Sequence, residues 1–319
     1  MITKQKQQKQ KIVVIVGPTA IGKSSLAVEL ARLFDGEIVS ADSRQIYRSL
    51  DIGTGKVTAR EMRGVRHHLL DVASPRKQWS VAQYVRHADR AIRSIVRHGK
   101  LPIVVGGTGF YIDALLGDTL LPDVPANPTL RRALRKQSPR ELLLELARLD
   151  PAHAQTIEPL NPRRLIRAIE IAHALGTVPK IQSREKYDAL VIGLTLPDPE
   201  LRERIRARLK ARLRRGLIAE IRRLREKGKL SWQRLDALGL EYRYVSRHLR
   251  GAITRDELEQ TLEQKIWQYA RRQKTWFKRN KKIRWFRPDE YKKISMCVKR
   301  GGTISNTSST STKIKGVSG

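Results

Sequence analysis

A glycine-rich segment near the N-terminus carries the residue types of a phosphate-binding loop. Residues 17–24 read GPTAIGKS, which matches the pattern G-x-x-x-x-G-K-[ST]. Glycines allow a tight turn whose backbone N–H groups point at phosphate oxygens, Lys23 adds a mobile positive charge, and the Ser24 hydroxyl suits Mg²⁺. The motif predicts that a diphosphate-bearing ligand is bound by Gly17, Pro18, Thr19, Ala20, Ile21, Gly22, Lys23 and Ser24.

The carboxylate that usually completes such a site is missing from its expected place. In nucleotide hydrolases with this loop, a second buried strand ends in an Asp that holds Mg²⁺. The best candidate strand here, Leu101–Val105, is followed by Gly106-Gly107-Thr108, and the nearest acid is Asp113. The sequence therefore argues against a motor or switch hydrolase. It favours other chemistry on the diphosphate, with a diphosphate leaving group as one option.

Two polar side chains follow the other predicted strands of this region. Asp42 comes after the short strand Glu37–Ser40, and Thr108 comes after Leu101–Val105. Because the carboxyl ends of parallel strands face one crevice, both are expected on the same edge as Lys23. Asp42 there either accepts a proton from an acceptor nucleophile or caps a helix. Thr108 either donates a hydrogen bond to a phosphate oxygen or is only part of a glycine-rich turn.

Alternating strands and helices must position these residues. The β-branched run Ile12–Val16 is typical of a strand buried on both faces, and helical spacing follows in Ser24–Phe34 and Val81–His98. Ala189–Leu196 returns to a strand pattern. The sequence predicts an α/β fold, a P-loop NTPase-like, doubly wound parallel sheet, with a helical insertion domain and a basic helical C-terminal region.

Composition shifts along the chain predict five segments. The insertion is expected to be wholly helical, with helices at Pro128–Arg135, Pro139–Leu149 and Pro162–Leu175. The last segment is rich in Gly, Ser and Thr at its end and is expected to be disordered. The predicted segments are a polar leader (1–11), the P-loop core (12–121), the helical insertion (122–188), the return strand with basic helices (189–290) and the tail (291–319).

The charge of the chain indicates a polyanionic partner. Its 319 residues include 65 Lys and Arg against 31 Asp and Glu, a formal net charge of +34. Such charge opposes a compact state unless a polyanion, most often nucleic acid, neutralises it, although a solvated basic surface is the alternative.

The composition also excludes several classes of protein. One cysteine, Cys297, excludes a disulfide scaffold and a cysteine zinc site. No apolar run reaches the ~18–20 residues of a membrane span, and the first residues lack the apolar core of a secretory signal. A cytoplasmic protein without a membrane partner is expected.

Two basic regions are candidate nucleic-acid surfaces. Leu201, Ile205, Leu209 and Leu213 form an apolar stripe, which puts Arg208 beside it either at the interior site or on a solvated flank. Residues 271–287 hold nine basic residues and no acid, with Trp and Phe interleaved. These aromatic rings either stack on RNA bases or pack inward.

Five segments together resemble the tRNA dimethylallyltransferase family. Members transfer a dimethylallyl group from dimethylallyl diphosphate to N6 of the adenosine 3′ of the anticodon (position 37) and require Mg²⁺. The resemblance therefore implies a prenyltransferase, with dimethylallyl diphosphate and a tRNA anticodon stem–loop as partners. A monomer is also expected. The segments are GPTAIGKS (17–24), SADSRQIYRSLDIGTGK (40–56), GGTGFYIDAL (106–115), NPRRLIRAIE (161–170) and RRQKTWFKR (271–279).

The resemblance also implies roles for individual residues. Lys23, Asp42 and Thr108 are the implied catalytic residues, with Asp42 as the base for the N6 proton and Thr108 bonded to the bridging oxygen. Arg167 and Arg208 join the loop in binding diphosphate, and Ser24 binds the metal. The implied tRNA-binding residues are Asp42, Ser43, Arg44, Gln45, Arg163, Arg164, Leu165, Ile166, Arg167, Arg243, Arg271, Arg272, Gln273, Lys274, Thr275, Trp276, Phe277 and Lys278.

This sequence departs from the family pattern at two of these places. Arg163 stands where many bacterial members have Gln, and Glu241 interrupts an expected Gly-Tyr-Arg. Three other functions remain open from the residues: an adenylate isopentenyltransferase using free nucleotide, a P-loop small-molecule kinase, and an RNA-binding protein with a vestigial nucleotide site. The basic surface and the long insertion argue against the first of these.

Overall fold

The computed structural model describes residues 9–117, 122, 124–179 and 185–301. The chain divides into two compact units. We call residues 1–116 and 185–319 the core unit, and residues 117–184 the insertion unit. The predicted insertion, 122–188, therefore started and ended a few residues too late.

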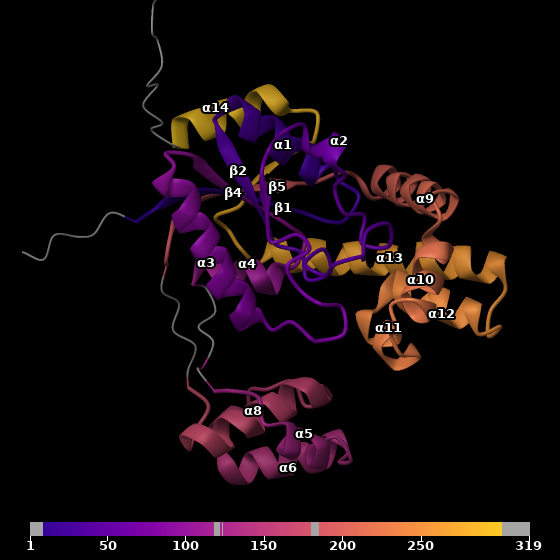
Figure 1. Ribbon diagram of the computed structural model, residues 1–319. Coiled ribbons are helices and arrows are strands. Elements are labelled where there is room, and N and C mark those ends of the chain that lie inside the picture. The colour runs from indigo at the N-terminus through magenta and orange to yellow at the C-terminus, as the bar shows by residue number, and fades with distance from the viewer. Residues whose placement is uncertain (1–8, 118–121, 123, 180–184, 302–319) are drawn as a thin grey trace, which may run out of the picture. The chain divides into compact units, whose positions relative to one another are not determined.

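A six-stranded parallel sheet organises the core unit (Figure 1). Its strand order is β3-β2-β4-β1-β5-β6, so the chain crosses over between most neighbouring strands. In the middle of the sheet, Val14 of β1 is aligned with Val104 of β4 and Val191 of β5. The strands are β1 (Lys11–Val16), β2 (Gly36–Ser40), β3 (His67–His68), β4 (Leu101–Val105), β5 (Asp188–Leu194) and β6 (Arg284–Phe286).

Helices cover both faces of this sheet (Figure 1). The helices of the N-terminal part are α1 (Lys23–Leu33), α2 (Ala59–Met62), α3 (Val81–Arg97) and α4 (Gly109–Leu116). Those of the C-terminal part are α9 (Asp198–Arg214), α10 (Leu217–Glu226), α11 (Trp232–Leu238), α12 (Leu240–Leu249), α13 (Arg255–Lys278) and α14 (Tyr291–Gly301).

Side chains of strand β1 pack into two separate hydrophobic cores, because successive side chains point to opposite faces of the sheet. Val13 and Ile15 pack in the cluster that contains α1 and α14. Val14 and Val16 pack in the cluster that contains α3 and α4. The continuous β-branched run that predicted a strand buried on both faces is thus explained by helices on each side.

The insertion unit is a small helical unit with a core of its own. Leu142, Leu146, Leu165 and Ile169 are fully buried in it. Capping side chains begin all four of its helices, and the buried Glu170 accepts a bidentate hydrogen bond from Arg131 at 2.7 Å. Its helices are α5 (Pro128–Leu134), α6 (Pro139–Leu149), α7 (Pro151–Ala154) and α8 (Pro162–Leu175).

The predicted elements agree with the structure, with a few corrections. Strands β3 and β6 were not predicted, because edge strands of two and three residues are too short to show periodicity. Lys11 begins β1 and is not part of the leader. The expectation of a disordered tail from residue 291 was wrong for Tyr291–Gly301, which forms α14 with Ile294 and Val298 buried. Residues 302–319 lie outside the described part.

No helix in the described part of the chain is long and apolar enough to cross a bilayer.

Candidate active site

The phosphate-binding loop lies at the carboxyl end of β1, where its shape requires glycine. Gly17 has a φ of +139°, and a Cβ there would lie 2.7 Å from the backbone oxygen of Leu194. Gly22 has a φ of +101° and immediately precedes α1. The N-terminal end of α1 therefore adds its positive dipole to the N–H groups of the loop.

A hollow of about 310 Å³ opens beside this loop. Its wall brings together most of the loop, Asp42 and Gln45 after β2, Gly106 and Gly107 after β4, and Arg208 of α9. All of these belong to the core unit. The predicted meeting of strand ends at one edge is confirmed, and Asp42 and Lys23 line the same pocket.

The Lys23 ammonium group lies in the pocket near a cation, Arg208, and an anion, Asp42. Its Nζ donates a hydrogen bond of 2.6 Å to the Pro18 carbonyl oxygen. Burial and the nearby Arg208 lower the pKa of Lys23 to about 7, while the Asp42 carboxylate acts in the opposite direction. The arrangement concentrates cationic groups around the loop, as expected where an anion binds.

Arg208 stands at the mouth of the pocket and keeps contact with solvent. Its guanidinium donates to the Gly55 carbonyl oxygen at 3.2 Å. Burial and the neighbouring Arg212 lower its pKa to about 10, so it stays protonated at neutral pH. Arg208 thus lines the pocket while its side chain stays exposed to solvent, and its contact with diphosphate stays a prediction.

Asp42 forms the predicted cap with one oxygen, and its role as a proton acceptor stays a prediction. Its Oδ1 accepts from the backbone N–H of Arg44 at 2.8 Å and of Gln45 at 3.3 Å, which is a local capping turn. Its Oδ2 has no hydrogen-bond partner within the described residues, and the side chain is only half-buried. The capped oxygen fixes the orientation of the carboxylate and leaves the other able to accept a proton.

Thr108 ties the loop after β4 to the loop after β2. Its hydroxyl accepts from the Ser43 backbone N–H at 3.1 Å and donates to Ser43 Oγ at 3.4 Å. Gly106 allows this close approach, since a Cβ there would lie 2.1 Å from the Ala41 oxygen. Thr108 is therefore adjacent to Asp42 in space, although 66 positions separate them in the sequence.

The structure gives Gln273 a different place from the predicted tRNA contact. Its side chain is 5% exposed and points into the site from α13. Its Oε1 accepts from the Thr19 backbone N–H at 2.8 Å, and its Nε2 donates to the Gly107 oxygen at 2.8 Å. Gln273 thus joins the phosphate-binding loop to the loop after β4, and its contact with tRNA stays a prediction.

Several other predicted tRNA-binding side chains are also buried. Phe277 is 3% exposed and packs in the core cluster that contains α3 and α4. In the insertion unit, Leu165 and Ile166 are 0% and 8% exposed and pack in its core. These apolar residues belong to a recognisable sequence motif, but they lie on the inner face of their helix. Their presence is explained by packing and not by ligand contact.

The remaining predicted tRNA-binding residues keep solvent contact. Arg271, Arg272, Thr275 and Lys278 are exposed on α13, whereas Lys274 pairs with Asp198. Trp276 is half-buried: its Nε1 donates to Asp113 at 3.0 Å and Arg279 lies 4.0 Å above its ring. Arg243 donates to the Asp236 oxygen at 3.0 Å.

Arg163, Arg164 and Arg167 belong to the insertion unit, where the first two are exposed. Arg167 donates to the Val124 oxygen at 2.9 Å and pairs with Glu170 at 3.6 Å. Its contact with diphosphate in the core unit therefore stays a prediction.

A buried polar network that sequence reasoning missed supports the remaining wall. The Glu220 carboxylate, 2% exposed, accepts from the backbone N–H groups of Asp51, Ile52 and Gly53 at 2.6–3.1 Å. Tyr242 also donates to Glu220, at 3.1 Å. Glu220 thereby holds the loop that continues into Thr54 and Gly55 of the pocket wall. Its position among Leu217, Ile221 and Leu224 on the buried side of α10 was the available signal.

The departure at Glu241 belongs to the same network. Glu241 is 8% exposed and pairs with Arg212 at 2.8 Å. Arg212 also donates to the Gly53 oxygen at 3.4 Å. Because both charges are buried, each needs the other. Glu241 therefore stabilises the same loop as Glu220.

The fold and the site together define a class of protein. A phosphate-binding loop after β1 shares a pocket with a carboxylate that follows β2, two strands away in the parallel sheet. The acid that a hydrolase would require directly after β4 is replaced by Gly106-Gly107-Thr108. These features define an α/β protein with a P-loop-like fold. A family model described as IPP transferase matches residues 45–280, and the chain belongs to that family.

Curated relatives and solved structures agree with this membership. A protein of Anoxybacillus flavithermus named tRNA dimethylallyltransferase is 40% identical over 282 residues, 87% of this chain and 90% of that protein. One of the same name from Bacillus subtilis is 40% identical over 287 residues, 87% and 91% of the two chains. The crystal structure of a Bacillus halodurans tRNA isopentenylpyrophosphate transferase has a TM-score of 0.70 at 35% identity, covering 92% and 97% of the chains.

A eukaryotic dimethylallyltransferase, described as acting on tRNA, has a TM-score of 0.74 to this chain. It is 27% identical and covers 84% of this chain, which spans 70% of that protein.

Proposed function

We propose that this protein transfers a dimethylallyl group from dimethylallyl diphosphate to N6 of the adenosine 3′ of the anticodon in tRNA. The observation that carries the proposal is the pocket shared by Lys23 and Asp42, in which a diphosphate cradle faces a carboxylate oxygen without a hydrogen-bond partner among the described residues. The names of its relatives and the basic character of the chain support tRNA as the acceptor.

The proposed reaction is a substitution at the allylic carbon. The N6 lone pair forms the new C–N bond while the C–O bond to the diphosphate breaks, and its electron pair leaves with the diphosphate. The N–H groups of the loop, Lys23 and Arg208 stabilise the charge that develops on the leaving group. Asp42 takes the N6 proton, a role typically worth 10²–10⁴-fold in rate.

Thr108 is proposed to hydrogen-bond the bridging oxygen. Its bond to Ser43 Oγ is long, at 3.4 Å, so the hydroxyl can rotate toward a better acceptor. The adenine must leave its stack to reach a pocket at the sheet edge. The free-energy cost of unstacking a base is lower in an anticodon loop than in a duplex.

Mg²⁺ is part of the proposal. Within the described residues, no group of three or more His, Cys, Asp or Glu is gathered to hold a metal. This fits an ion held mainly by substrate oxygens, with the Ser24 hydroxyl as the ligand from the loop. When bound, the ion neutralises charge on the diphosphate. We also propose that the protein acts as a monomer in the cytoplasm, where a single reduced cysteine is usual.

Labelled dimethylallyl diphosphate tests the proposal directly. The purified protein is incubated with the label and an anticodon stem–loop, with the same stem–loop carrying guanosine at the target position, or with free AMP. We expect label on the adenosine-containing RNA alone. Label on AMP but not on RNA would identify an adenylate isopentenyltransferase, phosphoryl transfer from ATP to a metabolite would identify a kinase, and RNA binding without any transfer would leave a binding protein.

A further inference from the structure

Helix α3 carries a line of arginines on its outer face. Arg86, Arg90, Arg93 and Arg97 are spaced by four, three and four residues, and all four are exposed. This spacing puts them on one side of the helix, with neighbours about 5–6 Å apart. The line extends about 16 Å along the axis, at about 1.5 Å per residue.

These arginines have no paired counter-charge among the residues that the structure describes. Within the described ranges none of the four forms an ion pair or a side-chain hydrogen bond, whereas elsewhere Arg206 pairs with Glu263 and Arg287 with Glu200. The one acid of α3, Asp89, is 7% exposed and is occupied by Lys186 and by Tyr187 at 2.6 Å. Four unpaired like charges on one face repel each other, and an anionic partner would relieve that repulsion.

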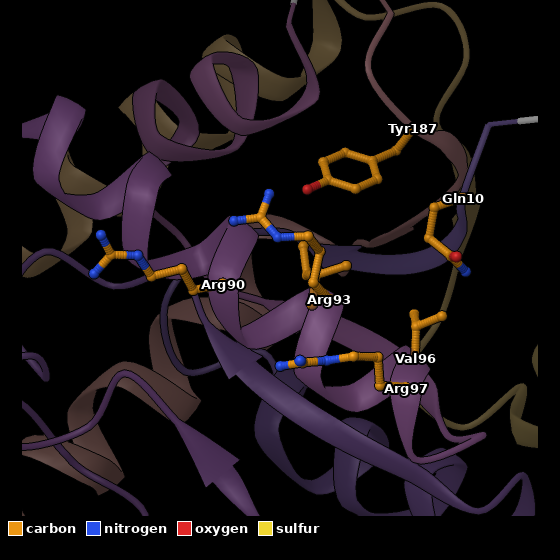
Figure 2. A pocket seen from close by; sticks show the side chains of 7 residues that line it. Gln10, Arg90, Arg93, Val96, Arg97 and Tyr187 are labelled. Carbon is orange, nitrogen blue, oxygen red and sulfur yellow. The ribbon is translucent and has the colours of Figure 1, made fainter. Parts of the chain in front are cut away.

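A hollow of about 590 Å³ lies beside this line (Figure 2). Figure 2 shows Arg90, Arg93 and Arg97 extending their guanidinium groups toward the same side, with the Tyr187 ring above Arg93. The remaining lining residues are Gln10, Ile92 and Val96. The wall of the hollow is mostly apolar, so the stems of the arginines line it, while their planar guanidinium forks, which match phosphate oxygens better than ammonium groups do, are exposed.

The hollow is separate from the pocket around Lys23. Gln10 precedes β1 and Tyr187 precedes β5, so it lies at the amino ends of the strands, opposite the phosphate-binding loop. Helix α3 precedes the parallel strand β4 and therefore runs from the carboxyl edge of the sheet to the amino edge. The four arginines form a path that leads away from the catalytic edge.

We infer that the arginine face of α3 binds the phosphodiester backbone of the tRNA, outside the nucleotides that enter the Lys23–Asp42 pocket. A single phosphate or mononucleotide would occupy only part of a line about 16 Å long, whereas a nucleic-acid backbone presents phosphates along its whole length. The inference rests on the proposed function for the identity of the RNA. That the ligand is an extended polyanion follows from the spacing, the exposure and the missing counter-charges of the four arginines, whatever reaction the protein catalyses.

The test compares two double substitutions of equal charge. R93Q/R97Q removes two cations from the face, and K292Q/K299Q removes two exposed cations from α14, which packs on the other side of the sheet. Dissociation constants for full-length tRNA are measured between low and high salt, and thermal unfolding verifies that both variants are folded. We expect R93Q/R97Q to weaken binding at least tenfold at about 0.1 M salt and to lower the salt slope by about 1.5–2.

Equal tRNA affinities and slopes for the two variants would overturn the inference. So would a loss by R93Q/R97Q of affinity for inorganic pyrophosphate or ATP with tRNA binding intact, because the face would then be a small-anion site. Transfer of label by the unmodified protein is assayed separately. If it fails while R93Q/R97Q still binds tRNA weakly, the proposed function falls and the RNA surface stands.

Discussion

Asp42 has an observed structural role and a proposed chemical one. One carboxylate oxygen closes a turn on Arg44 and Gln45, and the other has no hydrogen bond within the described residues. Residue type alone cannot separate a cap from a base, because Asp is favoured as both. The structure shows that the cap uses one oxygen only, so the proposed base function can be separated from it by mutation.

Asp42→Asn should remove the base and keep the turn, because the amide oxygen still accepts from both N–H groups. We expect kcat for prenyl transfer to fall about 10²–10⁴-fold with a melting temperature close to that of the unmodified protein. Single-turnover transfer and thermal unfolding measure the two effects. A kcat within threefold of the original would refute the assignment of Asp42 as the base.

Lys23 is expected to take up a proton when an anion binds. Its pKa of about 7 means that it is protonated below pH 7 and increasingly neutral above it, before any anion binds. A bound diphosphate favours the charged form and raises that pKa. At about pH 8 the unmodified protein should therefore take up close to one proton more than Lys23→Met on binding pyrophosphate, and at about pH 5.5 the difference should vanish.

Calorimetry in two buffers of different ionisation enthalpy measures this proton uptake. Titration of pyrophosphate itself contributes equally to both proteins and cancels in the difference. Equal proton uptake by the two proteins at pH 8 would show that Lys23 is already charged before binding, in conflict with its buried environment.

At the scale of an element, α13 has two faces with different functions. Its buried face carries Gln273 and Phe277, and its exposed face carries Arg271 and Arg272. The segment RRQKTWFKR contains both faces in consecutive letters. An amphipathic period of 3.6 residues explains why a motif predicted as a tRNA contact is only partly available to tRNA.

Gln273→Leu should impair chemistry without changing the electrostatics of tRNA binding. The substitution breaks both the bond from Thr19 and the bond to Gly107, which frees two loops that must stay aligned. We expect kcat to fall about 10- to 100-fold, because small displacements of a catalytic site have effects of this size. The salt slope of tRNA binding should not change. A lower tRNA affinity with kcat intact would restore Gln273 as a tRNA contact.

At the scale of the whole molecule, 65 basic residues outnumber 31 acidic ones, and the unpaired cations are distributed unevenly. Some cations are neutralised by ion pairs, such as Arg131 with Glu170 and Arg212 with Glu241. Others, including the four arginines of α3 and Arg271 and Arg272 of α13, form no ion pair within the described part of the chain. Net charge therefore predicts that a polyanion binds, and only the pairing pattern indicates where.

R271Q/R272Q should weaken tRNA binding and reduce its salt dependence. Both side chains are exposed on α13, so the loss is electrostatic and should not affect folding. We expect an increase in the dissociation constant of about tenfold and a slope lower by about 1–2. K292Q/K299Q is again the charge-matched control, and an effect equal to that of the control would exclude this face of α13 from the RNA interface.

The sequence alone was sufficient for the features that depend on short-range patterns. A buried β-branched run, a G-x-x-x-x-G-K-S loop and helical spacing predicted the parallel sheet, the phosphate cradle and the insertion, because these signals are written within about twenty consecutive residues. Strand ends meeting at one edge also followed from general rules of parallel sheets.

Only the tertiary structure decided which polar residues face the site and which support it. Gln273 reaches Thr19 from 254 positions away, and Glu220 reaches Ile52 from 168. Contacts between residues so far apart in the sequence produce no periodic pattern in either segment. Long-range packing decides whether a polar side chain faces the ligand or is buried and bonded within the protein. A buried polar group needs a hydrogen-bond partner, and the fold supplies that partner from a distant part of the sequence.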